Sequence, residues 1–269
     1  MPWGKSPSPR GEICRYRAGI GLATGQRPDP LASVFGTILV RMPLRAAFLC
    51  AAVLWGFRPP ADEPRLIETG IFHAGEVADA DAGAWLGLFP NEKGYAWHDV
   101  VVNVKPVRDE AVDKPNQRTG REASVVGGAR PVFLVRGGED LRVASVDGFR
   151  ELEQRALLNG DTIKLTIGNE QFTLRVTNPR RHADADMAGS SLELASNGVT
   201  QMLYSAPEDA NEPAWEVLWA GDLDGDGKLD LYLQLGDHYN VAERILFVST
   251  KAAPGQLVGR FAVFRTVGS

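Results

Sequence analysis

The sequence is poor in cysteine. Its two cysteines, Cys14 and Cys50, both lie within the first 50 residues. Residues 62–269 therefore have no means of forming a disulfide and no thiol for catalysis. Exported proteins commonly hold their loops with disulfides, so an exported chain of this composition needs another way to hold its loops. A bound metal ion is one such means, because its binding energy becomes folding energy.

Long apolar runs are also lacking. The longest is the 12-residue stretch 46–57, which is too short to cross a bilayer because a helix needs about 20 apolar residues. Its length fits the apolar region of a secretory signal, and Met42 stands just before it. We therefore interpret 42–61 as a signal-peptide-like segment and 1–41 as a disordered extension or misassigned start. This predicts a secreted or periplasmic protein; the alternative is an N-terminal membrane anchor formed together with residues 31–40.

Basic charge is scarce in the body of the chain. The first 61 residues carry eight of the 29 Lys and Arg residues and two of the 34 acidic residues, which leaves 21 basic and 32 acidic residues on 62–269, a formal charge of −11. Phosphate contacts need a basic surface, so this balance argues against a nucleic-acid partner. It also argues against docking on an anionic lipid surface.

The sequence lacks the short motifs of common catalytic sites. It has no H-E-x-x-H, no G-x-S-x-G, no phosphate-binding loop and no C-x-x-C. The four histidines are scattered along the chain: His73, His98, His182 and His238. His238, beside Asp237, Tyr239 and Asn240, either borders a metal ion or lies in a surface loop. We interpret three further groups as ordinary structure, namely Asp184 and Asp186 in a solvated loop, Glu139 and Asp140 in a turn, and Trp85 and Trp97 in the core.

Alternating apolar and polar residues indicate strands from residue 66 onward. Two hairpins are expected, one turning at Gly168 and the other at Asn197-Gly198, the strongest short hairpin signal. Only 149–158 has a helical pattern. Ten to twelve strands predict an all-β fold, an antiparallel β-sandwich or partly open barrel. Residues 62–269 would form a single β domain, with a possible break at the polar stretch 108–124. The strand segments are 97–107, 131–137, 161–178, 191–205, 244–250 and 259–267.

The most informative stretch is 221–230, which reads GDLDGDGKLD. Asp222, Asp224, Asp226 and Asp230 occupy positions 1, 3, 5 and 9 of a loop, and Gly227 occupies position 6. This is the front half of a calcium-loop pattern, in which alternate side chains point at one centre and glycine allows the sharp turn. Without a cation, neighbouring carboxylates repel each other by about 1 kcal/mol per pair in water. A bound Ca²⁺ would turn this repulsion into attraction.

The loop differs from an EF-hand. Position 12 is Leu233, where an EF-hand has a bidentate Glu. The flanking residues alternate like strands, with Leu229, Leu231 and Leu233 on one face and Asp230 and Tyr232 on the other. The sequence therefore predicts that the calcium loop joins two strands near the C-terminus.

The stretch VLWAGDLDGDGKLDLYLQL resembles the calcium-binding FG-GAP repeats of integrin-type propellers, in which such a loop lies between strands. The resemblance covers about 20 of the 269 residues, and a single copy does not make a propeller. It implies that Asp222, Asp224, Asp226 and Asp230 are side-chain ligands and that the Lys228 carbonyl completes the set. The layout is also similar to that of bacterial exported proteins that end in one such loop.

Two functions remain open from the sequence. The first is an exported calcium-binding β protein with a binding or structural role, in which calcium stabilises a C-terminal hairpin and an unidentified protein or glycan is the ligand. The second is a secreted or periplasmic hydrolase whose acidic residues come from separate strands, an arrangement that leaves no short motif.

Overall fold

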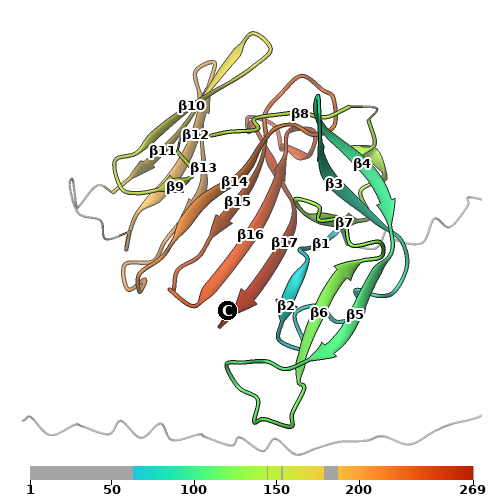
Figure 1. Ribbon diagram of the computed structural model, residues 1–269. Coiled ribbons are helices and arrows are strands. Elements are labelled where there is room, and N and C mark those ends of the chain that lie inside the picture. Colours follow the sequence, from blue (N-terminus) through green and yellow to red (C-terminus); the bar gives the residue numbers. More distant parts are fainter. Residues whose placement is uncertain (1–62, 144, 153, 179–186, 269) are drawn as a thin grey trace, which may run out of the picture. The chain divides into compact units, whose positions relative to one another are not determined.

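The computed structural model describes residues 63–143, 145–152, 154–178 and 187–268 (Figure 1). They all belong to one compact unit, Phe57–Ser269. The predicted extension 1–41, the signal-like segment 42–61, and His182 with its neighbours Asp184 and Asp186 lie outside the described residues. Within the described part of the chain, no helix has the length and apolar character needed to cross a membrane.

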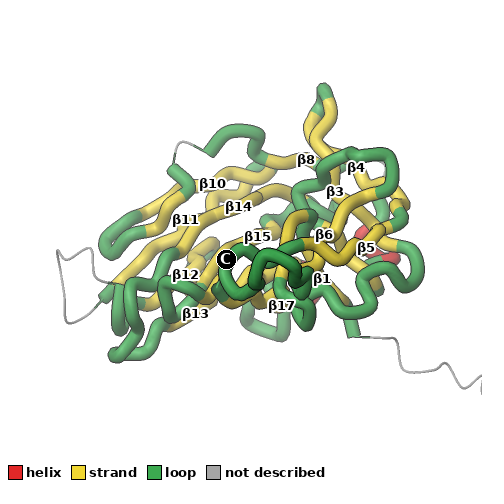
Figure 2. Tube along the Cα trace, turned by 60° about the horizontal axis from the view of Figure 1, so that its bottom comes forward, coloured by secondary structure: helices red, strands yellow, loops and turns green. Residues whose placement is uncertain are grey.

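The fold is all-β, as predicted. Its named strands pair antiparallel, and none of the four sheets closes into a barrel, so the arrangement fits a sandwich. Figure 2 shows that strands and loops account for nearly the whole described trace. The seventeen strands of the described residues exceed the ten to twelve expected, because five of them have only two or three residues. These short strands are β1 (Arg65–Ile67), β2 (Gly70–Phe72), β7 (Leu134–Arg136), β8 (Asp147–Gly148) and β9 (Ala156–Leu157).

The largest sheet has the strand order β17-β16-β15-β14-β8, and β9 pairs with the other end of β14. Its long strands are β14 (Trp215–Asp222), β15 (Asp230–Leu235), β16 (Val241–Val248) and β17 (Gly259–Val267). Both faces are covered, so five of the six residues of β15 are buried. Strands buried on both faces read as nearly continuous apolar runs, which explains the LDLYLQL sequence here.

Two hydrophobic cores lie on opposite faces of this sheet. Tyr232 and Leu246 belong to the first core, and Leu231 and Leu233 belong to the second. Successive side chains of a strand point to opposite faces, so β15 contributes to both cores in turn. The alternation predicted for the leucines of this strand is therefore confirmed.

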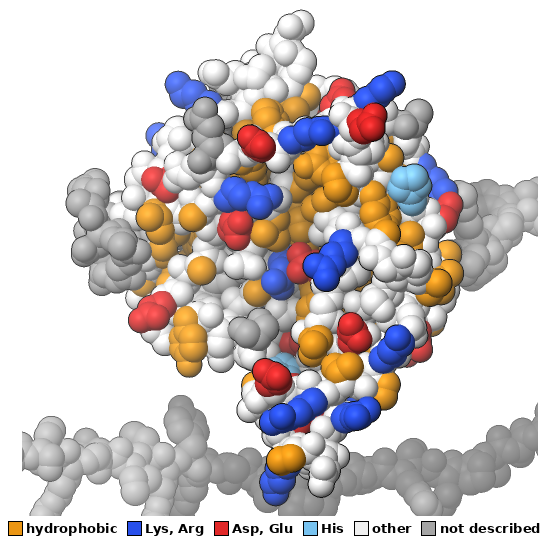
Figure 3. Space-filling model, viewed as in Figure 1, with side chains coloured by type: hydrophobic (Ala, Val, Ile, Leu, Met, Phe, Trp, Pro, Cys, Tyr) orange, Lys and Arg blue, Asp and Glu red, His pale blue; other side chains and the backbone are white. Residues whose placement is uncertain are grey.

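A four-stranded sheet packs on each core (Figure 1). The first core is completed by the sheet β1-β7-β3-β4, which includes β3 (Trp85–Asn91) and β4 (Gly94–Val100). The second core is completed by β10 (Thr162–Ile167), β11 (Glu170–Thr177), β12 (Ser191–Ser196) and β13 (Val199–Ser205). Figure 3 shows acidic and basic side chains interspersed with apolar ones on the face seen in Figure 1, as is usual for a globular domain.

Both predicted hairpins are present. Strands β10 and β11 pair up to Ile167 and Glu170, and Gly168 in the turn has a φ of +56°. Strands β12 and β13 turn at Asn197 and Gly198, which both have positive φ. These left-handed conformations are what a tight hairpin turn requires.

A small sheet, β2-β6-β5, contains β5 (Val102–Val107) and β6 (Gly120–Val125). The predicted strand 97–107 is divided here, because the chain leaves one sheet after Val100 and enters another at Val102. The polar stretch 108–124 forms the β5–β6 connection and most of β6, so it lies between two paired strands.

The helical prediction for 149–158 is wrong. None of the described residues of this segment is helical, and Ala156–Leu157 pairs with β14. Leu157 is buried in the second core, against which Phe149 and Leu152 also pack. Contacts with the six-stranded sheet therefore override the local pattern.

Candidate metal centre

The acidic loop connects β14 to β15, so it joins two neighbouring antiparallel strands as predicted. Asp222 is the last residue of β14 and Asp230 is the first of β15, where it opposes Gly221. Gly221 also pairs with Gly148 on β8. A paired strand on each side of β14 therefore fixes the base of the loop.

The loop brings three of the predicted ligands together. Asp222, Asp224 and Asp226 each offer a carboxylate oxygen, and these atoms lie within 4.8 Å of one another. Two oxygens that share one Ca²⁺ at about 2.3–2.6 Å lie at most about 5 Å apart. The spacing therefore fits a single calcium ion, and hard carboxylate oxygens are the donors that calcium takes.

Backbone hydrogen bonds to Asp222 curl the loop. Its Oδ1 accepts from the backbone N–H groups of Gly225 at 2.8 Å and Asp226 at 3.1 Å, and its Oδ2 accepts from that of Gly227 at 2.9 Å. Gly225 and Gly227 have φ values of +78° and +77°, a region that favours glycine. The glycine at position 6 therefore has the conformational role that the sequence pattern predicted.

Two hydroxyl groups from the β16–β17 connection reach the same carboxylates. Ser249 donates to Asp226 Oδ2 at 2.9 Å, and Thr250 donates to Asp224 Oδ2 at 2.5 Å. Both belong to the 3₁₀ turn η2 (Ser249–Lys251). No sequence pattern predicted this contact, because isolated Ser and Thr residues about 25 positions away match no motif.

Asp230 has a different environment. It is fully buried, its Oδ2 accepts from the Leu223 N–H at 2.6 Å, and its Oδ1 accepts from the Ser249 N–H at 2.7 Å. Burial raises the pKa of its carboxyl to about 7, although these two N–H groups oppose the rise and Asp224 adds to it. Asp230 is not among the three carboxylates that converge, and it ties the loop to the end of β16.

Asp222 and Lys228 match part of the predicted ligand pattern. Burial raises the pKa of Asp222, the hydrogen bonds from Gly227 and Gly225 oppose this, and the neighbouring Asp226 and Asp224 charges add to the rise. The Lys228 residue is exposed, and its backbone N–H donates to Asp226 Oδ1 at 2.9 Å. An outward side chain suits a position at which only the carbonyl would serve as a ligand.

The other candidates from the sequence lie elsewhere. His238 follows β15, so it lies beyond the end of that strand opposite to the acidic loop, and it contacts Asn240 and Asn211. Trp85 is buried and donates to the Ala80 carbonyl at 2.7 Å, as expected of a core residue.

Two further candidates lie close to the loop. Trp97 packs against the first core and donates to the Leu223 carbonyl at 3.2 Å. Asp140 lies in the 3₁₀ turn η1 (Glu139–Leu141) and pairs with Lys251 at 2.5 Å. Both side chains therefore support the segments around the acidic loop without entering its cluster of carboxylates.

The fold and the loop define an all-β protein that carries an acidic connection between two central strands. Comparisons of the chain with protein-family models, curated proteins and solved structures gave no match.

Proposed function

We propose that this is an exported calcium-binding β protein in which one Ca²⁺ at residues 222–230 stabilises the C-terminal sheet. The convergence of three carboxylates within 4.8 Å on one glycine-containing loop is the observation that supports it most directly. Asp222, Asp224 and Asp226 would supply side-chain oxygens, and Lys228 would supply its carbonyl, as in FG-GAP loops.

Asp230 stays in the proposed ligand set. Each of its oxygens accepts one backbone N–H, and an ionised carboxylate offers about four lone-pair positions. Burial raises the pKa of the Asp230 carboxyl in the absence of a cation. A cation beside this carboxyl would favour its ionised form.

A structural role for the ion follows from the contacts of the loop. The loop connects β14 to β15, and it is bonded to η2 through Ser249 and Thr250. An ion that holds the loop would therefore stabilise two connections of the six-stranded sheet, the one between β14 and β15 and the one between β16 and β17. Anything that binds the folded state alone raises its stability by mass action.

A binding role is supported by a cavity of about 350 Å³ beside the loop. Its lining includes Asp222 and Gly227 from the loop, together with Phe149 and Ile167, which supply apolar surface. We infer that the protein or glycan ligand would lie here, where its oxygens would approach a bound ion.

Isothermal titration of the full chain with CaCl₂ tests the proposal. Asp224→Asn removes one charge from the loop, and Asp81→Asn makes the same change at an exposed residue outside it. We expect heat of binding in the wild type and in Asp81→Asn, and a loss of affinity of at least about tenfold in Asp224→Asn. A wild type that takes up no calcium at millimolar concentration would overturn the proposal.

A further inference from the structure

A second cavity, of about 320 Å³, lies where the small sheet meets the end of β17. Its apolar wall includes Ile71, Phe72 and Val267. His73 also lines this cavity, and it is the only histidine among the lining residues.

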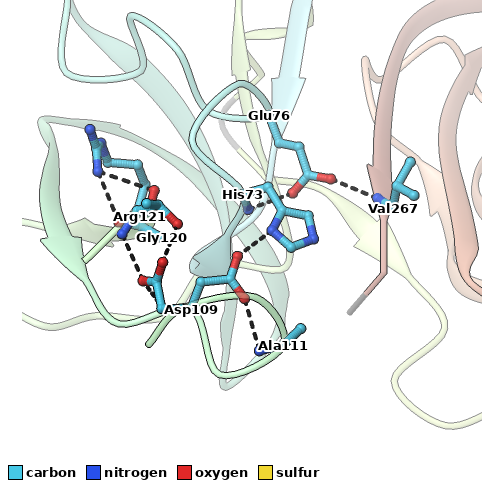
Figure 4. Close-up of polar contacts among 9 residues, drawn as sticks. His73, Glu76, Asp109, Ala111, Gly120, Arg121 and Val267 are labelled. Carbon is cyan, nitrogen blue, oxygen red and sulfur yellow. Dashed lines mark hydrogen bonds and ion pairs between the residues drawn. The ribbon is translucent and has the colours of Figure 1, made fainter. Parts of the chain in front are cut away.

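His73 is held by a buried carboxylate (Figure 4). Its Nδ1 bonds to Asp109 Oδ2, in a contact between residues 36 positions apart. The Asp109 side chain is 9% exposed and that of His73 is 33% exposed. Asp109 Oδ1 accepts from the Ala111 N–H at 3.1 Å, and the Asp109 N–H donates to Asp113 at 2.9 Å. Hydrogen bonds within its own loop therefore hold Asp109 in place, in addition to its bond with the imidazole.

Glu76 fixes the backbone of His73. Its Oε2 accepts from the His73 N–H at 2.9 Å, and its Oε1 accepts from the Val267 N–H at 2.6 Å (Figure 4). The position of the imidazole is thus set by three separate segments of the chain: residues 73–76, the β5–β6 connection and the end of β17.

The second ring nitrogen of His73 is directed away from Asp109 (Figure 4). Among the described residues, no hydrogen bond to His73 Nε2 is formed. A Cβ atom on Gly268 would lie 3.2 Å from this nitrogen, and Gly268 lines the same cavity with a φ of +75°. The glycine therefore leaves the space in front of Nε2 open.

This arrangement suits acid–base chemistry. When the Nδ1–H donates to Asp109, Nε2 carries the lone pair and accepts a proton from a molecule in the cavity. A carboxylate behind an imidazole fixes this tautomer and stabilises the imidazolium that forms. Histidine is the side chain that most often serves as the general base toward water or a hydroxyl group.

The charges of the lining limit the substrate class. Glu76, Asp109 and Glu110 are acidic, and Arg108 is the one Lys or Arg residue of the lining. The cavity therefore disfavours anionic molecules, and its apolar wall favours a hydrocarbon group. We propose that His73 and Asp109 hydrolyse an uncharged ester with a short hydrocarbon acyl group.

In this reaction His73 is the catalytic residue and Asp109 the positioning residue. Nε2 takes a proton from water while the water oxygen bonds to the carbonyl carbon of the ester. The tetrahedral intermediate then expels the alcohol oxygen, which takes the proton back from Nε2. The products are a carboxylic acid and an alcohol, and the imidazole returns to its starting form.

The proposal is independent of calcium, because no residue of 222–230 lines this cavity. It also differs from the hydrolase considered from the sequence, which relied on carboxylates of separate strands. No sequence motif links His73 to Asp109.

The test measures hydrolysis of 4-nitrophenyl butyrate by the full chain. The variants are His73→Gln, Asp109→Asn and the control His98→Gln, which removes an exposed imidazole from β4. General bases contribute about 10²–10⁴-fold to rate, so we expect His73→Gln to lower kcat/KM at least 100-fold and His98→Gln to leave it unchanged. Asp109→Asn should lower kcat with little change in KM, because its amide can donate to Nδ1 and leave the proton on Nε2.

Two further measurements separate catalysis from folding and from surface reactivity. Gly268→Ala leaves the dyad in place but crowds Nε2, so it should also slow hydrolysis; because alanine is strained at a φ of +75°, its rate is measured at a temperature at which circular dichroism shows the variant to be folded. The carboxylate-bearing 4-nitrophenyl succinate should react at least tenfold more slowly than the butyrate. A His73→Gln protein that is folded and retains the wild-type rate would overturn the proposal, as would a wild type that hydrolyses neither ester faster than buffer.

Discussion

The carboxylate of Asp230 accepts the backbone N–H of Ser249 at 2.7 Å and so joins the first residue of β15 to the turn after β16. The same carboxylate accepts the N–H of Leu223 inside the acidic loop. Asp230 therefore makes the conformation of the loop depend on the position of the turn that follows β16.

Asp230 predicts a specific pH dependence in the absence of calcium. Its pKa is raised to about 7 in the folded protein, so folding favours the protonated form. The stability it contributes is complete below the unfolded-state pKa, near 3.8, and is lost as the pH rises through about 7. At about 1.4 kcal/mol per pKa unit, this loss is on the order of 4 kcal/mol between pH 4 and 7. Urea denaturation in chelator measures it.

Asp230→Asn is the matched variant for this measurement, because its amide does not titrate. We expect its stability to change less than that of the wild type over the same pH range. If the two proteins show the same pH dependence, the pKa of Asp230 does not change on folding and the explanation is wrong.

Calcium should raise the melting temperature of the wild type. An ion at 100 times its Kd adds about 2.7 kcal/mol to the stability of a folded state that alone binds it. For a domain of this size, 1 kcal/mol corresponds to about 2–4 °C, so we expect an increase of about 5–11 °C over chelator. Asp226→Asn should lose most of this increase, and Asp81→Asn should keep it. Equal increases in both variants would place the binding outside the loop.

Much of the fold was predictable because its signals are local. Asn197-Gly198 determines a hairpin by its own backbone preference, and the alternation after Asp230 follows from the strand geometry of adjacent residues. The clustering of Asp222, Asp224 and Asp226 was predictable for the same reason, since these residues are two positions apart.

The parts of the fold and of the candidate sites that could not be predicted depend on pairings between distant segments. Ala156–Leu157 is a strand only because β14 lies beside it. Asp230 matches a ligand position in the sequence, yet its backbone partners are visible only after β16 is placed. His73 and Asp109 meet because β2 and β5 both pair with β6, which no spacing in the sequence indicates.

Gly221→Ala should be strongly destabilising. A Cβ atom at this position would lie 2.6 Å from the Cα of Gly148 and 2.7 Å from the Trp219 ring. Neither the paired backbone of β8 nor a buried indole gives way easily, and overpacking of this kind costs about 1–3 kcal/mol or more. Urea denaturation measures the loss. Gly198→Ala is unsuitable as a control because of its positive φ, whereas Gly75→Ala adds its Cβ in open space and should have little effect.

Tyr232→Phe should destabilise the protein more at pH 8 than at pH 5. The hydroxyl of the buried Tyr232 donates to Glu68 Oε1 at 2.7 Å, while Arg244 pairs with Oε2 at 2.9 Å. Burial raises the pKa of Glu68, and Arg244 and the Tyr232 hydroxyl oppose the rise. Without the hydroxyl, this pKa rises further, so stability is lost as the pH increases and Glu68 ionises.

A hydrogen bond to a charged group contributes about 1.5–3 kcal/mol, which urea denaturation at both pH values resolves. Tyr239→Phe, at a residue 64% exposed, is the control, and a Tyr232→Phe cost that is equal at both pH values would contradict the role assigned to this hydroxyl.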